Sequence, residues 1–138
     1  MPIQWKFNES YVMNGTEWLL DTNVVIGLLK QQTAAIDLIE RYPFDLSKAA
    51  VSQITRMELL GFPNLAHEEE VSIVDFLKYC RILFIDETVE QQAIQLRRNS
   101  HCKLPDAIVA ATALVNDLTL LTLDLRLKNL VTQFNATR

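Results

Sequence analysis

The sequence has few of the residues on which several common motifs depend. Its 138 residues include three glycines, which excludes the glycine-rich phosphate loop of the P-loop NTPases. The two cysteines, Cys80 and Cys102, have no C-x-x-C or zinc-finger spacing. The two histidines, His67 and His101, form no H-x-x-x-H pair. We therefore predict free thiols in a reducing compartment and no zinc site.

Long apolar runs and an excess of basic residues are also missing. No apolar run approaches the ~20 residues that span a membrane, and the first residues lack the basic-then-apolar order of a signal peptide. We therefore predict a cytoplasmic protein with no membrane partner. The net charge of −4 argues against nucleic-acid binding, which normally requires a basic surface. A carboxylate cluster that holds divalent cations is the exception, because the ions reverse the local sign of the charge.

The chain that remains has the composition of a soluble globular domain and is long enough to bury a core of its own. Residues 1–17 carry little pattern, and we treat them as an N-terminal extension in which Met13 is an alternative start. Residues 18–138 are predicted to form one domain. Short apolar runs at 18–21, 48–53, 81–85 and 118–122 alternate with helical patterns, and a last strand is predicted at 130–134. This order predicts an α/β fold, a three-layer sandwich around a mostly parallel sheet of four to five strands.

The stretch KLPDAIVAATAL, residues 103–114, predicts a buried helix at the centre of the fold. Pro105 fixes φ and lacks an N–H that the first helical turn would leave unpaired. Asp106 follows in that first turn, where the helix dipole favours an ionised carboxylate. The following residues are apolar almost all round, which is typical of a helix inside a protein. Taken alone, Asp106 is consistent with a simple helix cap.

Three further acids lie near the ends of predicted strands. Asp21 ends the run at 18–21, Asp124 comes two residues after the run at 118–122, and Glu58 lies on the helix after the run at 48–53. The carboxyl ends of parallel strands meet at one edge of a sheet, so these acids and Asp106 can converge there.

Convergence of four carboxylates has a chemical consequence. Two ionised carboxylates 4 Å apart repel by roughly 4 kcal/mol at an effective dielectric constant of 20, and divalent cations remove that penalty. Oxygen ligands without sulfur or imidazole suit Mg²⁺ or Mn²⁺. Such a site predicts hydrolysis of phosphodiester bonds.

Three basic residues, Arg97, Arg98 and Lys103, come shortly before Pro105. Two interpretations remain open for them. They complement the C-terminal end of the preceding helix, or they bind phosphate beside Asp106.

Four segments together resemble a PIN-domain ribonuclease, and most of all the VapC-like toxins of bacterial toxin–antitoxin pairs. They are LLDTNVVI with Asp21, VSQITRMELLG with Glu58, KLPDAIVAATAL with Asp106 and LLTLD with Asp124, in this order. The resemblance extends from about Trp18 to about Phe134. It implies a central parallel sheet flanked by helices and an acidic pocket that takes Mg²⁺ or Mn²⁺.

The resemblance also implies a function, a set of site residues and partners. The implied function is that of a metal-dependent endoribonuclease, the toxin of a type II (VapBC-like) pair. Asp21, Glu58, Asp106 and Asp124 would be the catalytic metal ligands, and Thr22, Asn23 and Thr122 match polar positions that line or brace the pocket. The implied partners are an RNA substrate, a VapB-like antitoxin and a second copy of the chain in a homodimer.

Two alternatives remain. The first is a PIN-like module that has lost catalysis and binds a partner, although all four acids are present. The second is a phosphatase of the haloacid dehalogenase type, because LLDTN resembles a strand that ends in a nucleophilic Asp. That chemistry requires a second acid two residues after Asp21, where this chain has Asn23.

Overall fold

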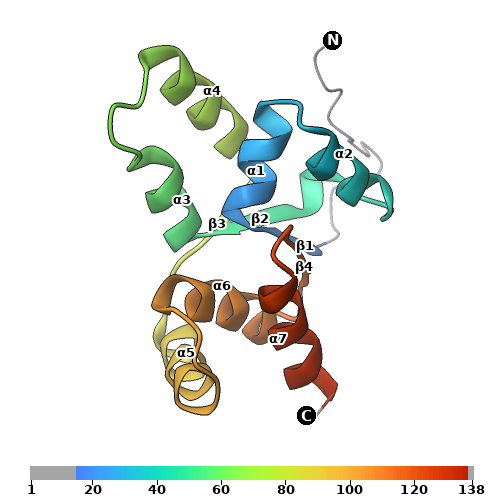
Figure 1. The fold of residues 1–138 in the computed structure, drawn as a ribbon, viewed down its shortest axis with the longest axis vertical. Coiled ribbons are helices and arrows are strands. Elements are labelled where there is room, and N and C mark those ends of the chain that lie inside the picture. Colours follow the sequence, from blue (N-terminus) through green and yellow to red (C-terminus); the bar gives the residue numbers. More distant parts are fainter. Residues whose placement is uncertain (1–14, 137–138) are drawn as a thin grey trace.

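The computed structural model describes residues 15–136, so most of the predicted extension lies outside the described residues. The described chain forms one sheet of four strands in the order β3-β2-β1-β4, and every pair of neighbours is parallel (Figure 1). The strands are β1 (Trp18–Leu20), β2 (Ala49–Ser52), β3 (Arg81–Leu83) and β4 (Thr119–Leu121). The predicted α/β fold with a parallel sheet is confirmed.

Helices cover both faces of the sheet and make the fold three-layered (Figure 1). One face carries α1 (Thr22–Leu29), α2 (Thr33–Glu40), α3 (Gln53–Leu60) and α4 (His67–Leu77), together with the short 3-10 helix η1 (Leu46–Lys48). The other face carries α5 (Glu87–Asn99), α6 (Leu104–Val115) and α7 (Leu125–Ala136).

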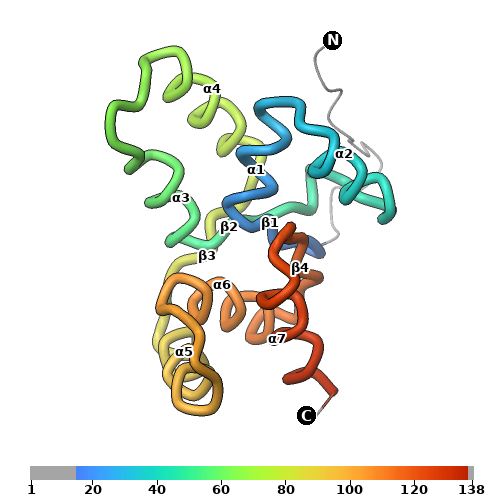
Figure 2. Tube along the Cα trace, viewed as in Figure 1, coloured from blue at the N-terminus to red at the C-terminus, as the bar shows by residue number. Residues whose placement is uncertain are grey.

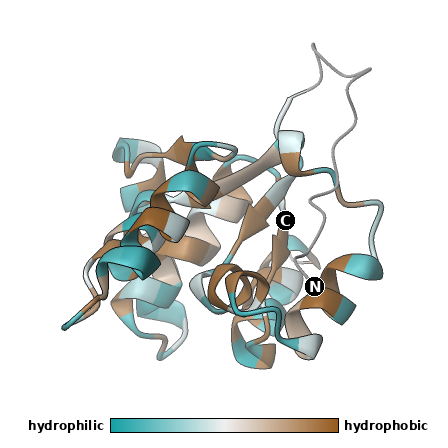
Figure 3. Cartoon of the chain, turned by 90° about the horizontal axis from the view of Figure 1, so that it is seen from above, coloured by the Kyte–Doolittle hydropathy of each residue, from teal (hydrophilic) through white to brown (hydrophobic). Residues whose placement is uncertain are grey.

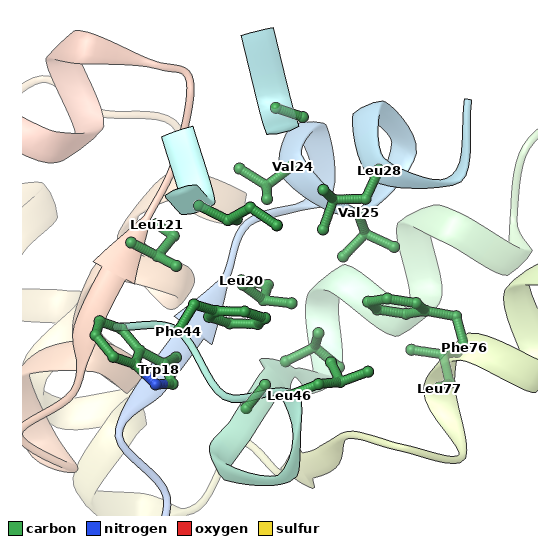
Figure 4. Close-up of a cluster of buried hydrophobic side chains, with 14 of the residues drawn as sticks. Trp18, Leu20, Val24, Val25, Leu28, Phe44, Leu46, Phe76, Leu77 and Leu121 are labelled. Carbon is green, nitrogen blue, oxygen red and sulfur yellow. The ribbon is translucent and has the colours of Figure 1, made fainter. Parts of the chain in front are cut away.

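Alternate residues of β1 supply the two halves of the core, because successive side chains of a strand point to opposite faces. Trp18 and Leu20 pack with the helices of the first face (Figure 4), and Leu19 packs with α5, α6 and α7. All three are buried. Burying each such side chain contributes about 1.5–3 kcal/mol. Figure 3 shows apolar residues on the strands and hydrophilic residues on the outer parts of the helices.

The central helix forms as the sequence predicts. α6 has a proline in its first turn, and Lys103 precedes it as the N-cap without a side-chain cap hydrogen bond. Every residue of α6 from Ala107 to Leu114 is buried. The rigid helix therefore holds Asp106 at a fixed place near the edge of the sheet.

The strand predicted at residues 130–134 is wrong, because this segment belongs to α7. Leu127, Val131 and Phe134 are spaced three or four residues apart, and they pack together against the core of the second face. The Oδ1 atom of Asp124 accepts hydrogen bonds from the backbone N–H groups of Arg126 at 2.9 Å and Leu127 at 3.4 Å. These bonds begin the helix, so the sheet has four strands rather than five.

The direction of the strand order reverses between β1 and β4. The chain steps from β1 to β2 to β3 in one direction, then returns across the sheet to place β4 beside β1. Helix α1 leaves β1 over one face, and α7 leaves β4 over the opposite face (Figure 2). Ligands of open α/β sheets bind outside the carboxyl ends of strands at such a point.

The structure bears on the predictions for the two cysteines and for membrane-spanning segments. Cys80 and Cys102 are both free, and burial raises the pKa of the Cys80 thiol to about 12, which keeps it protonated. Within residues 15–136, no helix combines the length and the apolar character needed to cross a membrane.

Candidate functional site

Asp21 lies at the carboxyl end of β1, where the chain turns into α1. Its side chain is buried, with 7% exposure, and its Oδ1 atom accepts a hydrogen bond from the Thr22 N–H at 2.8 Å. Its Oδ2 atom accepts a hydrogen bond from the Thr122 hydroxyl at 2.7 Å. Burial raises the pKa of Asp21, the bonds from Thr122 and Thr22 oppose the rise, and the charges of Glu58 and Asp124 add to it. The fold therefore holds a carboxylate where ionisation is costly.

Thr122 and Asn23 tie the ends of β1 and β4 together. The Asn23 side-chain amide donates to Asp21 Oδ2 at 3.2 Å and accepts from the Leu123 N–H at 3.1 Å. The Thr122 hydroxyl oxygen accepts from the Asp124 N–H at 3.0 Å. This network fixes the Asp21 carboxylate and the backbone at Asp124 relative to each other.

Glu58 approaches the site from α3. It is exposed on the helix surface, and its Oε1 atom accepts a hydrogen bond from the Thr22 hydroxyl at 2.8 Å. The Thr22 hydroxyl also lies 3.2 Å from the Thr55 hydroxyl, which is buried on the same helix as Glu58. Thr22 thus joins the start of α1 to α3 and directs Glu58 toward Asp21.

Asp106 is half-buried in the first turn of α6. Burial raises its pKa, the charges of Asp124 and Asp21 raise it further, and Lys103 opposes the rise. Asp106 and Asp124 both line a pocket of about 510 Å³ between the α5–α6 loop and α7. Asp106 and Asp124 thus lie beside a space open to a ligand.

The charges of the four predicted acids act on one another at Asp21 and Asp106. Asp21 interacts with Glu58 and Asp124, and Asp106 interacts with Asp21 and Asp124. Mutual repulsion of this kind is what a bound divalent cation relieves, and an all-oxygen set of ligands suits Mg²⁺ or Mn²⁺. The chemistry of the residues therefore fits the predicted ion.

The side chains are nevertheless not gathered into a finished ligand set. Among the residues described, no three acids, histidines or cysteines lie close enough together to hold a metal ion. In the described structure Asp124 caps α7, Glu58 accepts from Thr22, and both oxygens of Asp21 have donors. A carboxylate that accepts a hydrogen bond keeps lone pairs for a cation, so these bonds are compatible with metal binding.

The basic residues noted in the sequence separate in space. Arg97 and Arg98 lie in the last turn of α5 and line a different pocket, whereas Lys103 lines the pocket of Asp106 and Asp124. Arg126 lines the same pocket and was not among the predicted site residues. Its place there is set by how α7 packs, which the strand predicted at 130–134 did not anticipate.

Comparison with known proteins identifies the family. Residues 18–132 match the PIN domain. The chain belongs to the PIN domain family. PIN domains are generally nucleases that use divalent metal ions. The predicted family is therefore confirmed, and the haloacid dehalogenase alternative is wrong.

Solved structures with the same fold come from toxin–antitoxin systems. The chain is 31% identical to a chain of a toxin–antitoxin complex from Klebsiella pneumoniae, with a TM-score of 0.64 over 75% of this chain and 83% of that one. It is 26% identical to a chain of DNA-bound VapBC from Salmonella typhimurium, with a TM-score of 0.64 over 76% and 84% of the two chains. FitAcB from Neisseria gonorrhoeae, at 24% identity and a TM-score of 0.64 over 83% and 93%, shows the same fold. No curated protein matches the chain.

Proposed function

We propose that this PIN-domain protein is a Mg²⁺- or Mn²⁺-dependent endoribonuclease and the toxin of a type II, VapBC-like toxin–antitoxin pair. The observation that carries the proposal is the hydrogen-bond network at the carboxyl ends of β1 and β4, which holds Asp21, Glu58 and the backbone of Asp124 near one another in a PIN domain. The toxin–antitoxin complexes of similar fold support the assignment to a toxin.

In this proposal Asp21, Glu58, Asp106 and Asp124 hold the ion. When bound, Mg²⁺ or Mn²⁺ supplies acidity to an attacking water and charge stabilisation to the departing oxygen of the phosphodiester. The protein orients the carboxylates. Thr122 and Asn23 hold Asp21 through hydrogen bonds at 2.7 and 3.2 Å, and Thr22 holds Glu58 at 2.8 Å.

The proposed partners are an RNA substrate, a VapB-like antitoxin and a second copy of the chain, all in the cytoplasm. The complexes from Klebsiella pneumoniae and Salmonella typhimurium support the antitoxin. A homodimer is supported by Ile85, Ile94 and Leu104, which are 36%, 41% and 50% exposed and line one hollow.

Cleavage of labelled RNA by the purified protein with Mg²⁺ or Mn²⁺ tests the nuclease. Asp21→Asn and Asp106→Asn should each lower the rate by about 100-fold or more, since metal-assisted charge stabilisation is worth several kcal/mol. Asp37→Asn is the matched control, because Asp37 is exposed on α2. Decay of the RNA at the same rate in all four proteins would indicate a contaminating nuclease and contradict the proposal.

The inactive binding module remains the second candidate, and one observation favours it. The described side chains include no ready-made group of three metal ligands. A protein that binds RNA or an antitoxin but leaves RNA intact over a range of Mn²⁺ concentrations would establish this alternative.

A further inference from the structure

The pocket between the α5–α6 loop and α7 has a second set of residues besides its two acids. Its volume is about 510 Å³, within the range of roughly 300–1,000 Å³ that is usual for ligand sites. Asp106 and Asp124 occupy part of the lining, and Lys103 and Arg126 bring two permanent cations to it. Two negative charges are thus matched by two positive charges, in a chain whose net charge is −4.

The two cations are exposed and available to a ligand. Lys103 precedes the first turn of α6, and Arg126 lies in the first turn of α7. The salt bridges within residues 15–136 are Lys48–Glu17 and Lys78–Asp75, so neither Lys103 nor Arg126 takes part in one there. Cations beside a phosphodiester site offset the repulsion between substrate phosphate and the carboxylates.

One face of α7 extends the pocket with amide side chains. Arg126, Asn129 and Gln133 recur at intervals of three and four residues and all line this pocket. Arg126 and Gln133 are seven positions apart, or about 10 Å along the helix. Lys128, on the same helix, lines a different hollow. The face toward Asp124 therefore presents one cation followed by two amides, and the half-buried Leu130 lies between them.

We propose that this pocket binds the RNA nucleotide next to the bond that is cut, with its phosphate on Lys103 and Arg126 and its base against Leu130, Asn129 and Gln133. The proposal rests on the proposed nuclease function and assigns the substrate side of that site. Single-stranded RNA exposes base edges that amide side chains can pair with and an apolar face that can pack on leucine. Of Arg97, Arg98 and Lys103, the basic residues before Pro105, the proposal assigns phosphate binding to Lys103 alone.

A binding measurement tests this independently of turnover. The Asp21→Asn protein, which leaves the pocket lining intact, is titrated with a fluorescent single-stranded RNA in Mg²⁺ at several salt concentrations, and gels record whether the RNA stays whole. Adding Lys103→Ala or Arg126→Ala should weaken binding about tenfold and lower the slope of log K against log salt by roughly 0.7. Lys103→Arg and Arg126→Lys should restore most of the affinity.

Matched variants distinguish RNA binding in the pocket from a general effect of positive charge on the protein. Lys128→Ala removes a cation from the same helix but from another hollow, so it should leave affinity and salt slope unchanged. Asn129→Ala and Gln133→Ala should change the preference among oligomers of A, C, G and U while leaving the salt slope in place.

The outcomes distinguish the two proposals. If the wild-type protein cleaves RNA and Asp21→Asn does not, but the Lys103 and Arg126 variants bind like Lys128→Ala, the pocket assignment is wrong and the nuclease stands. If binding depends on Lys103 and Arg126 while neither the wild type nor any variant cleaves RNA, the proposal that the pocket binds RNA is supported and the proposed nuclease activity is wrong. If the Asp21→Asn protein binds no RNA, the proposal that this pocket binds an RNA nucleotide is wrong.

Discussion

Thr122 is the residue on which the geometry of the site depends most. Its hydroxyl donates to Asp21 Oδ2 at 2.7 Å and accepts from the Asp124 N–H at 3.0 Å. Thr122→Val keeps the shape and removes these bonds, together with a longer one that the hydroxyl accepts from the Asn23 amide at 3.4 Å. The buried Asp21 carboxylate then has one strong donor fewer. We expect a loss of about 1–3 kcal/mol in the free energy of unfolding, measured by urea denaturation.

Thr132→Val is the control for that substitution. Thr132 is exposed on α7, and its hydroxyl donates to the Lys128 carbonyl within the same helix. We expect a change within about 0.5 kcal/mol. Equal destabilisation by the two variants would show that the Thr122 network has no special role.

The raised pKa of Asp106 predicts how stability depends on pH. The pKa of Asp106 in the folded protein lies above the 3.8 of the unfolded chain. At a pH between the folded and the unfolded pKa, the folded protein therefore binds more protons than the unfolded chain. Stability therefore falls as pH rises through that window and remains lower at neutral pH. In EDTA, Asp106→Asn should match the wild type near pH 4 and exceed it at pH 7 by about 0.5 kcal/mol, a small value because the group is partly exposed.

Thermal melts from pH 4 to pH 7.5 measure this difference. Asp37→Asn, at an exposed position on α2, is melted under the same conditions as the control for loss of a surface carboxylate. A difference between Asp106→Asn and the wild type that stays constant with pH, or shrinks as pH rises, would contradict the argument.

At the scale of elements, α1 packs tightly against α2 at Gly27. A Cβ atom there would lie 2.5 Å from the Cβ of Ala35, and Ala35 is fully buried. Because two packed helices cannot both give way without losing contacts, Gly27→Ala should cost about 1–3 kcal/mol of stability. Denaturation midpoints in urea measure the loss.

Gly15→Ala provides the comparison, because a Cβ atom at Gly15 meets nothing within 4 Å. This variant should be neutral within about 0.5 kcal/mol. If Gly27→Ala were as stable as Gly15→Ala, the separation of α1 and α2 would be adjustable, and the position of Asp21 at the start of α1 would be less tightly defined than the contacts indicate.

The elements differ in how well the sequence predicts them, for physical reasons. The four strands and α6 were predictable, because apolar runs and Pro105 act locally. The segment at 130–134 was mistaken for a strand, since a short apolar run fits either structure and its helix depends on the Asp124 cap and on contacts with α6.

The candidate site was predictable in part. The positions of Asp21 and Asp124 follow from the strand ends, and Asp106 follows from the proline turn. The hydrogen bond that holds the exposed Glu58 side chain comes from Thr22, which lies 36 residues away in the sequence, so no local pattern carries it. Arg126 was missed for the same reason, because its place beside Lys103 is set by how α7 packs. The catalytic roles of these residues remain predictions.

For the whole molecule, the balance of charge explains why a nuclease can be acidic. The chain carries −4 overall, and its proposed ligands for the ion add repulsion near the carboxyl ends of β1 and β4. A divalent cation bound there lowers the negative potential that an approaching RNA meets. In this proposal Lys103 and Arg126 supply the remaining attraction locally, so the surface elsewhere has no need to be basic.

The same balance predicts that divalent metal stabilises the whole fold. An ion that binds the folded chain and not the unfolded one adds about 2.7 kcal/mol at a hundred times its dissociation constant. Melting temperature should therefore rise by several degrees as Mn²⁺ or Mg²⁺ replaces EDTA, and the rise should grow with metal concentration. Asp21→Asn should melt at or above the wild type in EDTA, because the buried charge is gone, yet gain little from metal. Asp37→Asn should respond to metal as the wild type does. A melting temperature indifferent to metal in the wild type, or an equal rise in Asp21→Asn, would show that these carboxylates hold no ion.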